Sequence, residues 1–355
     1  MADKPIEVAT YQPVLVTGAT GYVAGWIVRR LLEAGATVHA PVRDPENAAK
    51  VGHLAAIAEA SPGEIKFFKA DLLKEGSYAE AMEGCGVVFH TASPFTISVK
   101  DPQKELIDPA VKGTRNVLEE ANRVESVHRV VLTSSCAAIY TDAQDTLDVP
   151  GRCITEDMWN TTASLEYQPY SYSKTLAEKV AWEIAEAQER WRLVVVNPSL
   201  VVGPAVQAKP TSQSFNILRQ LGDGTARMGA PKLGFGVVDV RDLAEAHLAA
   251  GYLADAEGRH IVSGHETDLL EMALALRPKF ADQYPLPKKA LPKWLVWLVG
   301  PLLGMDRKFV SRTVNVPWRG DNSKSIRALG MSYRPMQESM EDMFTKMIED
   351  GYIKK

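Results

Sequence analysis

The sequence predicts an α/β fold with a doubly wound parallel sheet. Seven short apolar runs rich in β-branched residues are separated in most places by helical patterns, and a glycine-rich turn follows the first run. This alternation is typical of parallel sheets whose helices cover both faces. The predicted strands are 14–17, 37–42, 65–68, 87–90, 130–133, 193–197 and 260–262.

The alternation of strands and helices stops near residues 203–232 and again after residue 264. We therefore expect a sheet domain in two pieces, residues 12–202 and 233–263. A smaller, mostly helical domain would comprise residues 203–232 and 264–355 and be interleaved with the first in sequence.

The composition is that of an ordinary globular protein and excludes several classes of function. Hydrophobic residues make up 46% of the 355 residues and charged residues 24%. The 40 basic and 44 acidic residues give a net charge of −4, without the positive surplus that nucleic acid attracts. No uninterrupted apolar run is long enough to span a membrane. We expect a small-molecule ligand, no nucleic acid, no transmembrane segment, and a monomer or homodimer.

The cysteines and histidines indicate a reducing compartment without a metal site. Cys85, Cys136 and Cys153 are odd in number and far apart, which argues against a disulfide framework and a zinc site. The seven histidines show no metal-binding spacing. Residues 1–11 are expected to be a leader without the features of a secretory or transit signal. We therefore expect a cytoplasmic location and no metal.

The turn after the first strand has the composition of a phosphate-binding loop. Gly18 and Gly21 stand where a strand ends and a helix begins, and they leave room for a pyrophosphate at the first helical amides. Ala24 and the adjacent Gly25 are small enough for close packing of helix on strand. This position between strand and helix predicts a dinucleotide site in a sheet of the Rossmann type.

The end of the second strand indicates which dinucleotide binds. An acid there accepts a hydrogen bond from the adenosine ribose, whereas an arginine pairs with a 2′-phosphate. The strand ends in Arg43 and Asp44, followed by Pro45. Asp44 could serve the ribose, but we expect it to be the N-cap of a helix whose first turn accepts the proline. Arg43 then remains for the phosphate, and the predicted cofactor is NADP(H).

A tyrosine and a lysine four residues apart open the next informative helical pattern. Tyr170 and Lys174 would lie on one face of that helix. The ordinary pKa of tyrosine is about 10, so a tyrosine that donates a proton near neutral pH needs a nearby cation. Neither Tyr167 nor Tyr172 has a lysine at this spacing. We predict that Tyr170 is the proton donor and Lys174 the cation; the alternative is a pair of surface residues.

Two serines follow a predicted strand at its carboxyl end, where open α/β sheets bind their ligands. Ser134 and Ser135 come directly after the strand 130–133, and a hydroxyl there can hold a carbonyl oxygen. The spacing does not distinguish between the two. Since no Gly-x-Ser-x-Gly sequence surrounds them, a hydrolase is not indicated.

In combination, the glycine turn, the serine site and the Tyr170/Lys174 pair resemble the extended short-chain dehydrogenase/reductases, within the NAD-dependent epimerase/dehydratase superfamily. Other segments resemble the group of dihydroflavonol reductases, cinnamoyl-CoA reductases and yeast methylglyoxal or ketone reductases. These segments are Val42-Arg-Asp-Pro, Ser173-Lys-Thr-Leu-Ala-Glu-Lys, Asn197-Pro-Ser-Leu-Val-Val-Gly-Pro and Val238-Asp-Val-Arg-Asp-Leu-Ala. The resemblance extends over nearly the whole chain.

The resemblance implies an NADPH-dependent carbonyl reductase with a Rossmann domain for the cofactor and the smaller domain for the substrate. Hydride would pass from the nicotinamide to a carbonyl carbon while Tyr170 donates the proton and Ser135, the second of its pair, holds the oxygen. The predicted cofactor contacts are Thr17, Gly18, Thr20, Gly21, Tyr22, Val23, Arg43, Lys50, Asp71, Leu72, Thr91, Ala92, Ser93, Thr133, Tyr170, Lys174, Pro198, Ser199 and Leu200. The predicted substrate contacts are Phe95, Ser135, Tyr140 and Tyr170.

Two departures from the family pattern bear on the substrate. Tyr140 stands where plant dihydroflavonol reductases carry an asparagine, and residues 166–170 differ from the Asn-Trp-Tyr-Cys-Tyr string of cinnamoyl-CoA reductases. These departures favour a general aldehyde or ketone as substrate. The aromatic segment 291–305 is expected to be a core or lid helix that can also line an apolar pocket, with membrane contact as the alternative.

Three other functions share parts of this pattern. A 3β-hydroxysteroid-type dehydrogenase also acts on apolar alcohols. A nucleotide-sugar epimerase or dehydratase has the same fold and Tyr/Lys pair, but usually uses NAD. A non-catalytic NADP sensor is the alternative outside the enzymes, although such proteins commonly lose the tyrosine or the lysine.

Replacing Arg43 tests the preference for the phosphorylated cofactor. Arg43→Ala should raise the apparent KM for NADPH about tenfold or more, because charge-assisted hydrogen bonds to the 2′-phosphate are lost. The KM for NADH, which has no 2′-phosphate, should change little. Steady-state kinetics with both cofactors measure the difference, and equal effects on the two would refute the role of Arg43.

Overall fold

A computed structural model describes residues 6–93, 99–208 and 210–353. Its large sheet has the order β3-β2-β1-β4-β5-β6-β9, and all of its strands are parallel. These strands are β1 (Val14–Thr17), β2 (Thr37–Val42), β3 (Glu64–Lys69), β4 (Val87–His90), β5 (Arg129–Thr133), β6 (Arg192–Pro198) and β9 (Gly258–Val262). Each corresponds to one predicted strand, so the predicted fold class is confirmed. The predicted substrate residue Phe95 lies outside the described residues.

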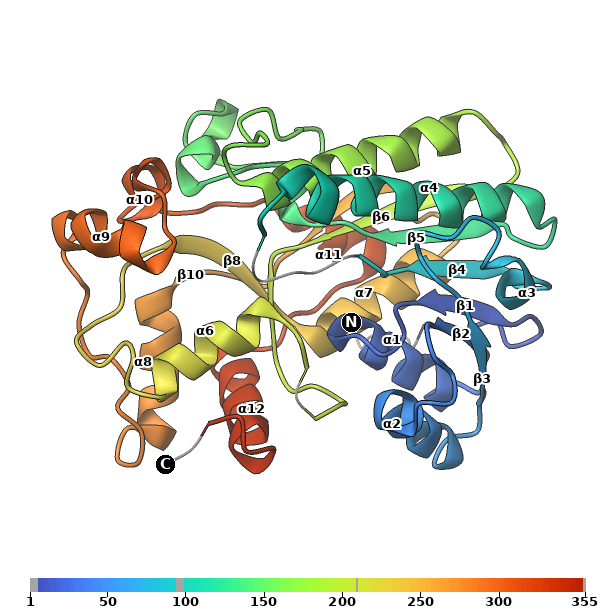
Figure 1. Ribbon diagram of the computed structural model, residues 1–355, viewed down its shortest axis with the longest axis horizontal. Coiled ribbons are helices and arrows are strands. Elements are labelled where there is room, and N and C mark those ends of the chain that lie inside the picture. The colour runs from blue at the N-terminus through green and yellow to red at the C-terminus, as the bar shows by residue number, and fades with distance from the viewer. Residues whose placement is uncertain (1–5, 94–98, 209, 354–355) are drawn as a thin grey trace.

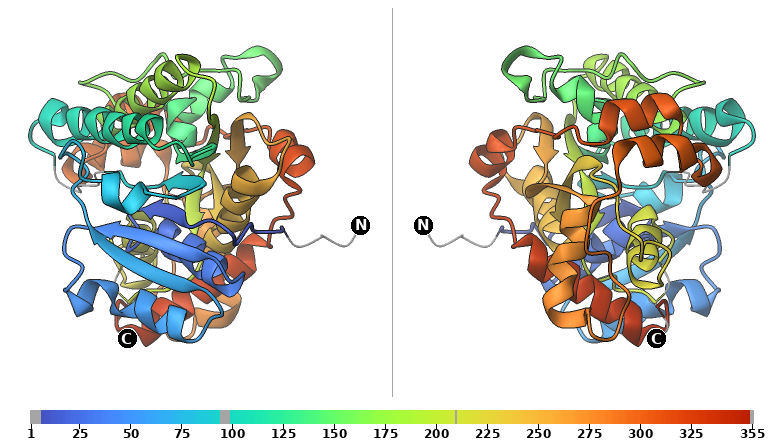
Figure 2. Two further views of the ribbon diagram at one scale, coloured as in Figure 1. Left: turned by 90° about the vertical axis from the view of Figure 1, so that its right-hand side faces the viewer. Right: turned by 90° about the vertical axis from the view of Figure 1, so that its left-hand side faces the viewer.

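Helices cover both faces of the large sheet, as Figures 1 and 2 show. One face carries α1 (Tyr22–Glu33), α2 (Ala48–Glu59), α7 (Val240–Tyr252) and α11 (Ser323–Leu329); the other carries α3 (Ala79–Met82), α4 (Asp108–Arg123) and α5 (Pro169–Glu186). Side chains alternate along each strand: Val14 and Val16 of β1 pack in the first core, and Leu15 packs in the second. Because both faces are buried, the central strands β1 and β4 are almost entirely apolar, whereas the edge strand β3 carries charged residues.

A smaller sheet of mixed direction lies beside the large one. Its order is β10-β8-β7, formed by His265–Asp268, Gly234–Asp239 and Leu200–Val202, with β8 parallel to β7 and antiparallel to β10. Helices α6 (Gln213–Gly222), α8 (Leu269–Phe280), α9 (Lys293–Val299), α10 (Arg307–Thr313) and α12 (Met336–Glu349) surround it. Short helices are η1 (Gln103–Ile107), η2 (Cys136–Ala138), η3 (Ala143–Thr146), η4 (Pro150–Arg152) and η5 (Gly300–Leu303).

The division into two domains stays a prediction, and some elements group differently from the expected boundaries. Strands β7 and β8 fall in the ranges expected for the sheet domain, yet they pair in the smaller sheet. Helix α11 falls in the range expected for the smaller domain, yet Leu329 at its end packs in the core of the large sheet. The chain therefore passes between the two sheets repeatedly.

The predicted N-cap at Asp44 is wrong. Helix α2 begins at Ala48, with Asn47 at the N-cap position. The Asp44 carboxylate instead accepts a hydrogen bond from the amide of Glu46, at 3.3 Å. Aspartate readily closes such a turn on its own backbone, and here the turn, which also contains Pro45, separates the strand end from the helix.

The aromatic segment 291–305 forms α9 and η5 and has one face in a small core. Val296 packs there with Val310 and Val314, whereas Trp294 is 68% exposed. Within the described ranges, no helix is long and apolar enough to cross a membrane. The function of this segment as a lid, a pocket wall or a membrane contact stays a prediction.

Two glycine substitutions test how closely α7 packs on the sheet. A Cβ atom at Gly251 would lie 2.6 Å from Cζ of the buried Phe89, so Gly251→Ala should destabilise the protein by about 1–3 kcal/mol. The control is Gly52→Ala in α2, where nothing lies within 4 Å. It should be neutral or stabilising, by up to about 1 kcal/mol, because alanine favours the helix. Denaturant unfolding measures both changes, and equal effects would contradict the close packing.

Candidate active site

The carboxyl ends of four neighbouring strands form the edge at which the predicted site residues gather. Strand β1 leads into the glycine turn and β4 into Thr91–Ser93, while β5 leads into Ser134 and Ser135 and β6 ends at Pro198. Parallel strands place all of these ends on one side of the sheet. The two segments most distant in sequence, the glycine turn and Pro198, thereby lie at the same edge.

The glycine turn has the geometry of a phosphate cradle. Gly18 has a φ of +67°, and a Cβ atom there would lie 3.0 Å from Cα of Ala92. The carbonyl of Gly18 accepts from the amide of Gly21 at 2.8 Å, and helix α1 begins at the next residue, Tyr22. No side chain caps that helix. Its first amides are therefore available to an anion, and the turn fits a pyrophosphate.

The side chains of two predicted cofactor contacts, Thr17 and Thr91, form hydrogen bonds with other protein groups. Thr17 Oγ1 lies 2.9 Å from Nδ1 of His90 and accepts from the amides of Thr91 and Ala92 at 3.1 Å. The hydroxyl of Thr91 donates to the carbonyl of Thr17 at 2.6 Å. These bonds hold the ends of β1 and β4 together. Any contact of Thr17 with a nucleotide would therefore have to come from its backbone.

The segment after β7 lies on the first turns of α1, which the sequence did not indicate. Tyr22 donates its hydroxyl hydrogen to the carbonyl of Gly203 at 2.5 Å, and Trp26 Nε1 donates to the carbonyl of Pro204 at 2.7 Å. A Cβ atom at Gly25 would lie 2.5 Å from Cγ2 of Val206. Gly25 thus makes room for this segment and not for the packing of helix on strand. Ala24, which is 2% exposed, lies in the core between α1 and the sheet.

Val23 and Thr20 complete this contact region. The side chain of Val23 packs against the cores of both sheets, and the carbonyl of Thr20 accepts from Nε2 of Gln207 at 3.4 Å. The glycine turn is therefore covered on one side by the segment between β7 and α6.

Basic side chains stand exposed at the end of β2 and the start of α2. Arg43 and Lys50 are both exposed, and neither takes part in an ion pair within the described part of the chain. Two further predicted contacts, Asp71 and Leu72, follow β3. The Asp71 carboxylate accepts from the amide of Leu73 at 2.9 Å, and the carbonyl of Leu72 accepts from Asn116 at 2.9 Å. Arg43 and Lys50 are therefore free to pair with a phosphate.

Tyr170 and Lys174 lie one turn apart at the start of α5, which begins at Pro169. Loss of water around the phenol raises the pKa of Tyr170, although the residue is 42% exposed, and the Ser135 side chain offsets part of that rise. Burial also lowers the pKa of Lys174 to about 8, against the attraction of Glu178. In the absence of a cofactor, the phenol is therefore protonated at neutral pH, as a proton donor must be.

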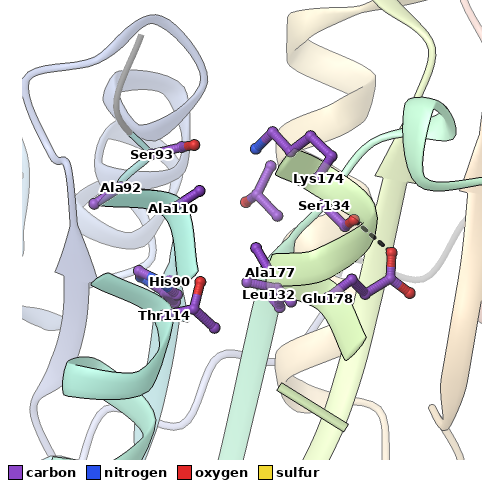
Figure 3. Close-up of a pocket in the computed structure, with 11 residues that line it drawn as sticks. His90, Ala92, Ser93, Ala110, Thr114, Leu132, Ser134, Lys174, Ala177 and Glu178 are labelled. Carbon is purple, nitrogen blue, oxygen red and sulfur yellow. Dashed lines mark hydrogen bonds between the residues drawn. The ribbon is translucent and has the colours of Figure 1, made fainter. Parts of the chain in front are cut away.

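The structure separates the two serines that the sequence left equivalent. Ser134 is 5% exposed and donates its hydroxyl hydrogen to Oε2 of Glu178 at 2.5 Å (Figure 3). The hydroxyl of Ser135 instead accepts from the amide of Ala137 at 3.1 Å, and the Ser135 side chain lowers the pKa of the Tyr170 phenol. Ser135 is thus the serine beside the predicted proton donor.

A cavity lies between the ends of β4 and β5 and is closed by α4 and α5. Its lining includes His90, Ala92, Ser93, Ala110, Thr114, Leu132, Thr133, Ser134, Lys174, Ala177 and Glu178. Figure 3 shows the Lys174 side chain reaching across it toward Ser93. The hydroxyl of Thr133 lies 2.7 Å from Nε2 of His247 in α7. The side chain of this predicted cofactor contact is therefore also paired with a side chain of the protein itself.

The remaining predicted contacts lie at the ends of β6 and β5. Pro198 pairs with Val262 of β9, the amide of Ser199 donates to the Val262 carbonyl at 3.2 Å, and Leu200 opens β7. Tyr140 follows η2, and its ring centroid lies 5.8 Å from that of Trp318. Trp318 was not predicted because it stands far along the chain and only folding brings it beside Tyr140.

Sequence reasoning also missed a buried carboxylate next to the site. Glu178 is 1% exposed and accepts hydrogen bonds from Ser134, Asn197 and Arg259. A signal was present, because Glu178 follows Lys174 by four residues and so lies on the same face of the helix.

Comparison with known proteins agrees with this architecture. A model of the NAD dependent epimerase/dehydratase family matches residues 14–264. The chain is 36% identical to cinnamoyl-CoA reductase CAD2 of Medicago truncatula, covering 96% of both chains. It is 32% identical to a dihydroflavonol 4-reductase of Arabidopsis thaliana, over 96% of this chain and 83% of the relative.

Among solved structures, Gre2 of Candida albicans in complex with NADPH superimposes with a TM-score of 0.76 at 27% identity, covering 96% of this chain and 99% of that one. The yeast methylglyoxal/isovaleraldehyde reductase Gre2, also complexed with NADPH, gives 0.75 at 26% identity, over 96% and 100%. The predicted family relationship is confirmed: the chain belongs to the NAD dependent epimerase/dehydratase family and is a reductase of the extended short-chain dehydrogenase/reductase type.

Proposed function

We propose that the protein is an NADPH-dependent carbonyl reductase that converts aldehydes or ketones to alcohols, reversibly. One observation carries the proposal: Tyr170 and Lys174 lie one turn apart at the start of α5, at the sheet edge that also holds Ser135 and the glycine turn. A hydroxyl pair and a cation beside a dinucleotide cradle are what hydride transfer to a carbonyl requires.

The features of this chain fit the phosphorylated dinucleotide. The glycine turn, with its positive φ at Gly18 and uncapped helix, would hold the pyrophosphate. Arg43 and Lys50, exposed and outside the ion pairs of the described residues, would hold the 2′-phosphate. Two of the similar structures are NADPH complexes, which supports the same choice here.

The chemistry divides between cofactor and protein. When bound, the cofactor supplies the hydride that reaches the carbonyl carbon. Tyr170 donates its phenolic proton to the carbonyl oxygen, and the Ser135 hydroxyl holds that oxygen by a hydrogen bond. The charge of Lys174 stabilises the phenolate that remains and orients the nicotinamide ribose. Pro198 and Leu200, at the end of β6 and the start of β7, would flank the nicotinamide.

The surroundings of the site favour an apolar carbonyl compound. Tyr140 packs beside Cys136, Ile139, Ile154 and Trp318, in a cluster that adjoins Ser135. Tyr140 is the partly buried ring of this cluster, so it would meet an apolar or aromatic substituent of the carbonyl compound. The monomeric or homodimeric state and the cytoplasmic location stay predictions.

Removing one hydroxyl tests the proton donor. Tyr170→Phe should lower kcat by about 10²–10⁴-fold, the usual worth of a positioned general acid, while NADPH binding persists. Tyr172→Phe is the matched control, because Tyr172 lies on the same helix without a lysine four residues later. Loss of NADPH absorbance against a panel of aldehydes, ketones and diketones measures turnover. Substantial turnover by Tyr170→Phe would exclude this mechanism.

The two serines should respond differently to the same substitution. Ser135→Ala should lower kcat by about 10²-fold, because it removes a donor to the carbonyl oxygen. Ser134→Ala removes a bond to Glu178 instead, and should lower the free energy of unfolding by about 1–3 kcal/mol with a smaller effect on kcat. Kinetics and denaturant unfolding of both variants measure this, and the reverse order would assign the role to Ser134.

A further inference from the structure

We propose that Glu178 is a positioning residue for the reductase reaction: its buried carboxylate keeps Lys174 protonated and holds the serine-bearing strand end against α5. This inference rests on the proposed function for its kinetic readout. The role goes beyond core packing, because the carboxylate connects the helix that carries Tyr170 and Lys174 to the strands that form the rest of the site.

The Glu178 side chain has no exposed surface and is surrounded by donors. Its Oε2 atom accepts from Ser134 Oγ at 2.5 Å and from Asn197 Nδ2 at 2.9 Å. Its Oε1 atom accepts from Arg259 Nε at 2.5 Å, and Trp182 Nε1 lies 3.4 Å away. These donors come from the end of β5, from β6, from β9 and from α5 itself, so one carboxylate ties four elements together.

Arg259 extends this connection to the segment that precedes α5. Its Nη1 atom donates to the carbonyls of Glu156 and Met158, at 2.8 and 2.5 Å. Its guanidinium lies 4.1 Å from the ring centroid of Trp159. Groups other than Glu178 therefore hold the guanidinium in place. The guanidinium in turn holds the Glu178 carboxylate through their ion pair. Replacing only one member of such a buried ion pair destabilises a protein strongly, because the other charge is left buried without a partner.

The position of Glu178 relative to Lys174 gives it a second effect. The two residues lie four apart on one helix face, and both line the cavity of Figure 3. Of the described residues that line this cavity, Glu178 alone carries a carboxylate. The attraction of Glu178 raises the pKa of Lys174 against the larger effect of burial.

The other titratable groups around this pair do not replace Glu178. His90, which faces Lys174 from the end of β4, is neutral, because burial and the lysine charge lower its pKa to about 3. Tyr170 and Cys136 are protonated, because burial raises the pKa of both side chains. Arg259 is positive and cannot stabilise an ammonium. Glu156, whose pKa burial raises, is bound by the amide of Ile261 at 3.0 Å.

The sign of the effect follows from these charges. Replacing Glu178 by glutamine removes a negative charge near Lys174, so the ammonium loses its proton at a lower pH. Reduction needs the ammonium, and activity therefore falls as the pH rises through the pKa of Lys174. The alkaline limb of the pH profile should move to lower pH in the variant. A packing defect alone would lower kcat or stability without moving that limb.

The kinetic test compares pH profiles of kcat/KM for three proteins with NADPH and one carbonyl substrate. In Glu178→Gln the alkaline limb should lie about one pH unit below that of the wild type. Glu183→Gln is the matched control, because Glu183 is on the same helix but its side chain is 70% exposed, and its limb should not move. An unshifted limb in Glu178→Gln would overturn the proposal.

If Glu178→Gln fails to fold because Arg259 is left unpaired, the variant Glu178→Gln/Arg259→Met removes both buried charges and serves as the second measurement. Its limb should also move to lower pH, since Glu178 is the group that acts on Lys174. A limb at the wild-type position would again overturn the proposal.

A titration without turnover separates this proposal from the proposed function. In protein labelled with 13C at lysine Cε, the signal that disappears in Lys174→Arg belongs to Lys174, and its pH dependence gives the pKa directly. A lower pKa in Glu178→Gln than in the wild type supports the role of Glu178 even if no carbonyl compound is reduced. Equal pKa values would refute that role even if the protein proves to be a carbonyl reductase.

Discussion

The common direction of the strands in the large sheet is the constraint on which the site depends. Because β1, β4, β5 and β6 are parallel and adjacent, their carboxyl ends place the glycine turn, Thr91, Ser135 and Pro198 at one edge. The helices that connect parallel strands must cross over a face, which brings the N-terminus of α1 to the same edge. The cradle and the serine therefore result from the same arrangement of the backbone, although more than a hundred residues separate them.

The buried carboxylate of Glu178 joins α5 to the neighbouring strands by side-chain hydrogen bonds, which the backbone does not provide. Parallel strands bring Ser134, Asn197 and Arg259 near α5, and each has a buried hydrogen-bond donor there. Glu178 accepts hydrogen bonds from all three, and these bonds attach α5 to β6, to β9 and to the residue that follows β5. Since Tyr170 and Lys174 lie on that helix, the electrostatics of the core and the chemistry of the site are coupled.

The sequence pattern within short windows predicted the strands of the large sheet and the helix at Tyr170. It did not predict the contacts between segments that are distant in sequence. All seven strands of the large sheet, the helix at Tyr170 and the glycine turn follow from apolar periodicity and turn residues in short windows. The smaller sheet was missed because β7 has only three residues and β10 is polar, so neither has a strand pattern. The partners of Gly25 and Glu178 depend on folding, and Asp44 was assigned to the wrong turn because aspartate suits both positions.

The bonds from Tyr22 and Trp26 to the backbone after β7 have a consequence for any movement of the smaller sheet against the large one. They join the first turns of α1 to the segment between β7 and α6, and Val206 fills the space above Gly25. A single-hinge rotation about this segment would break both bonds and expose that contact. A motion that keeps both bonds must therefore carry this segment together with α1, which is packed in the core of the large sheet.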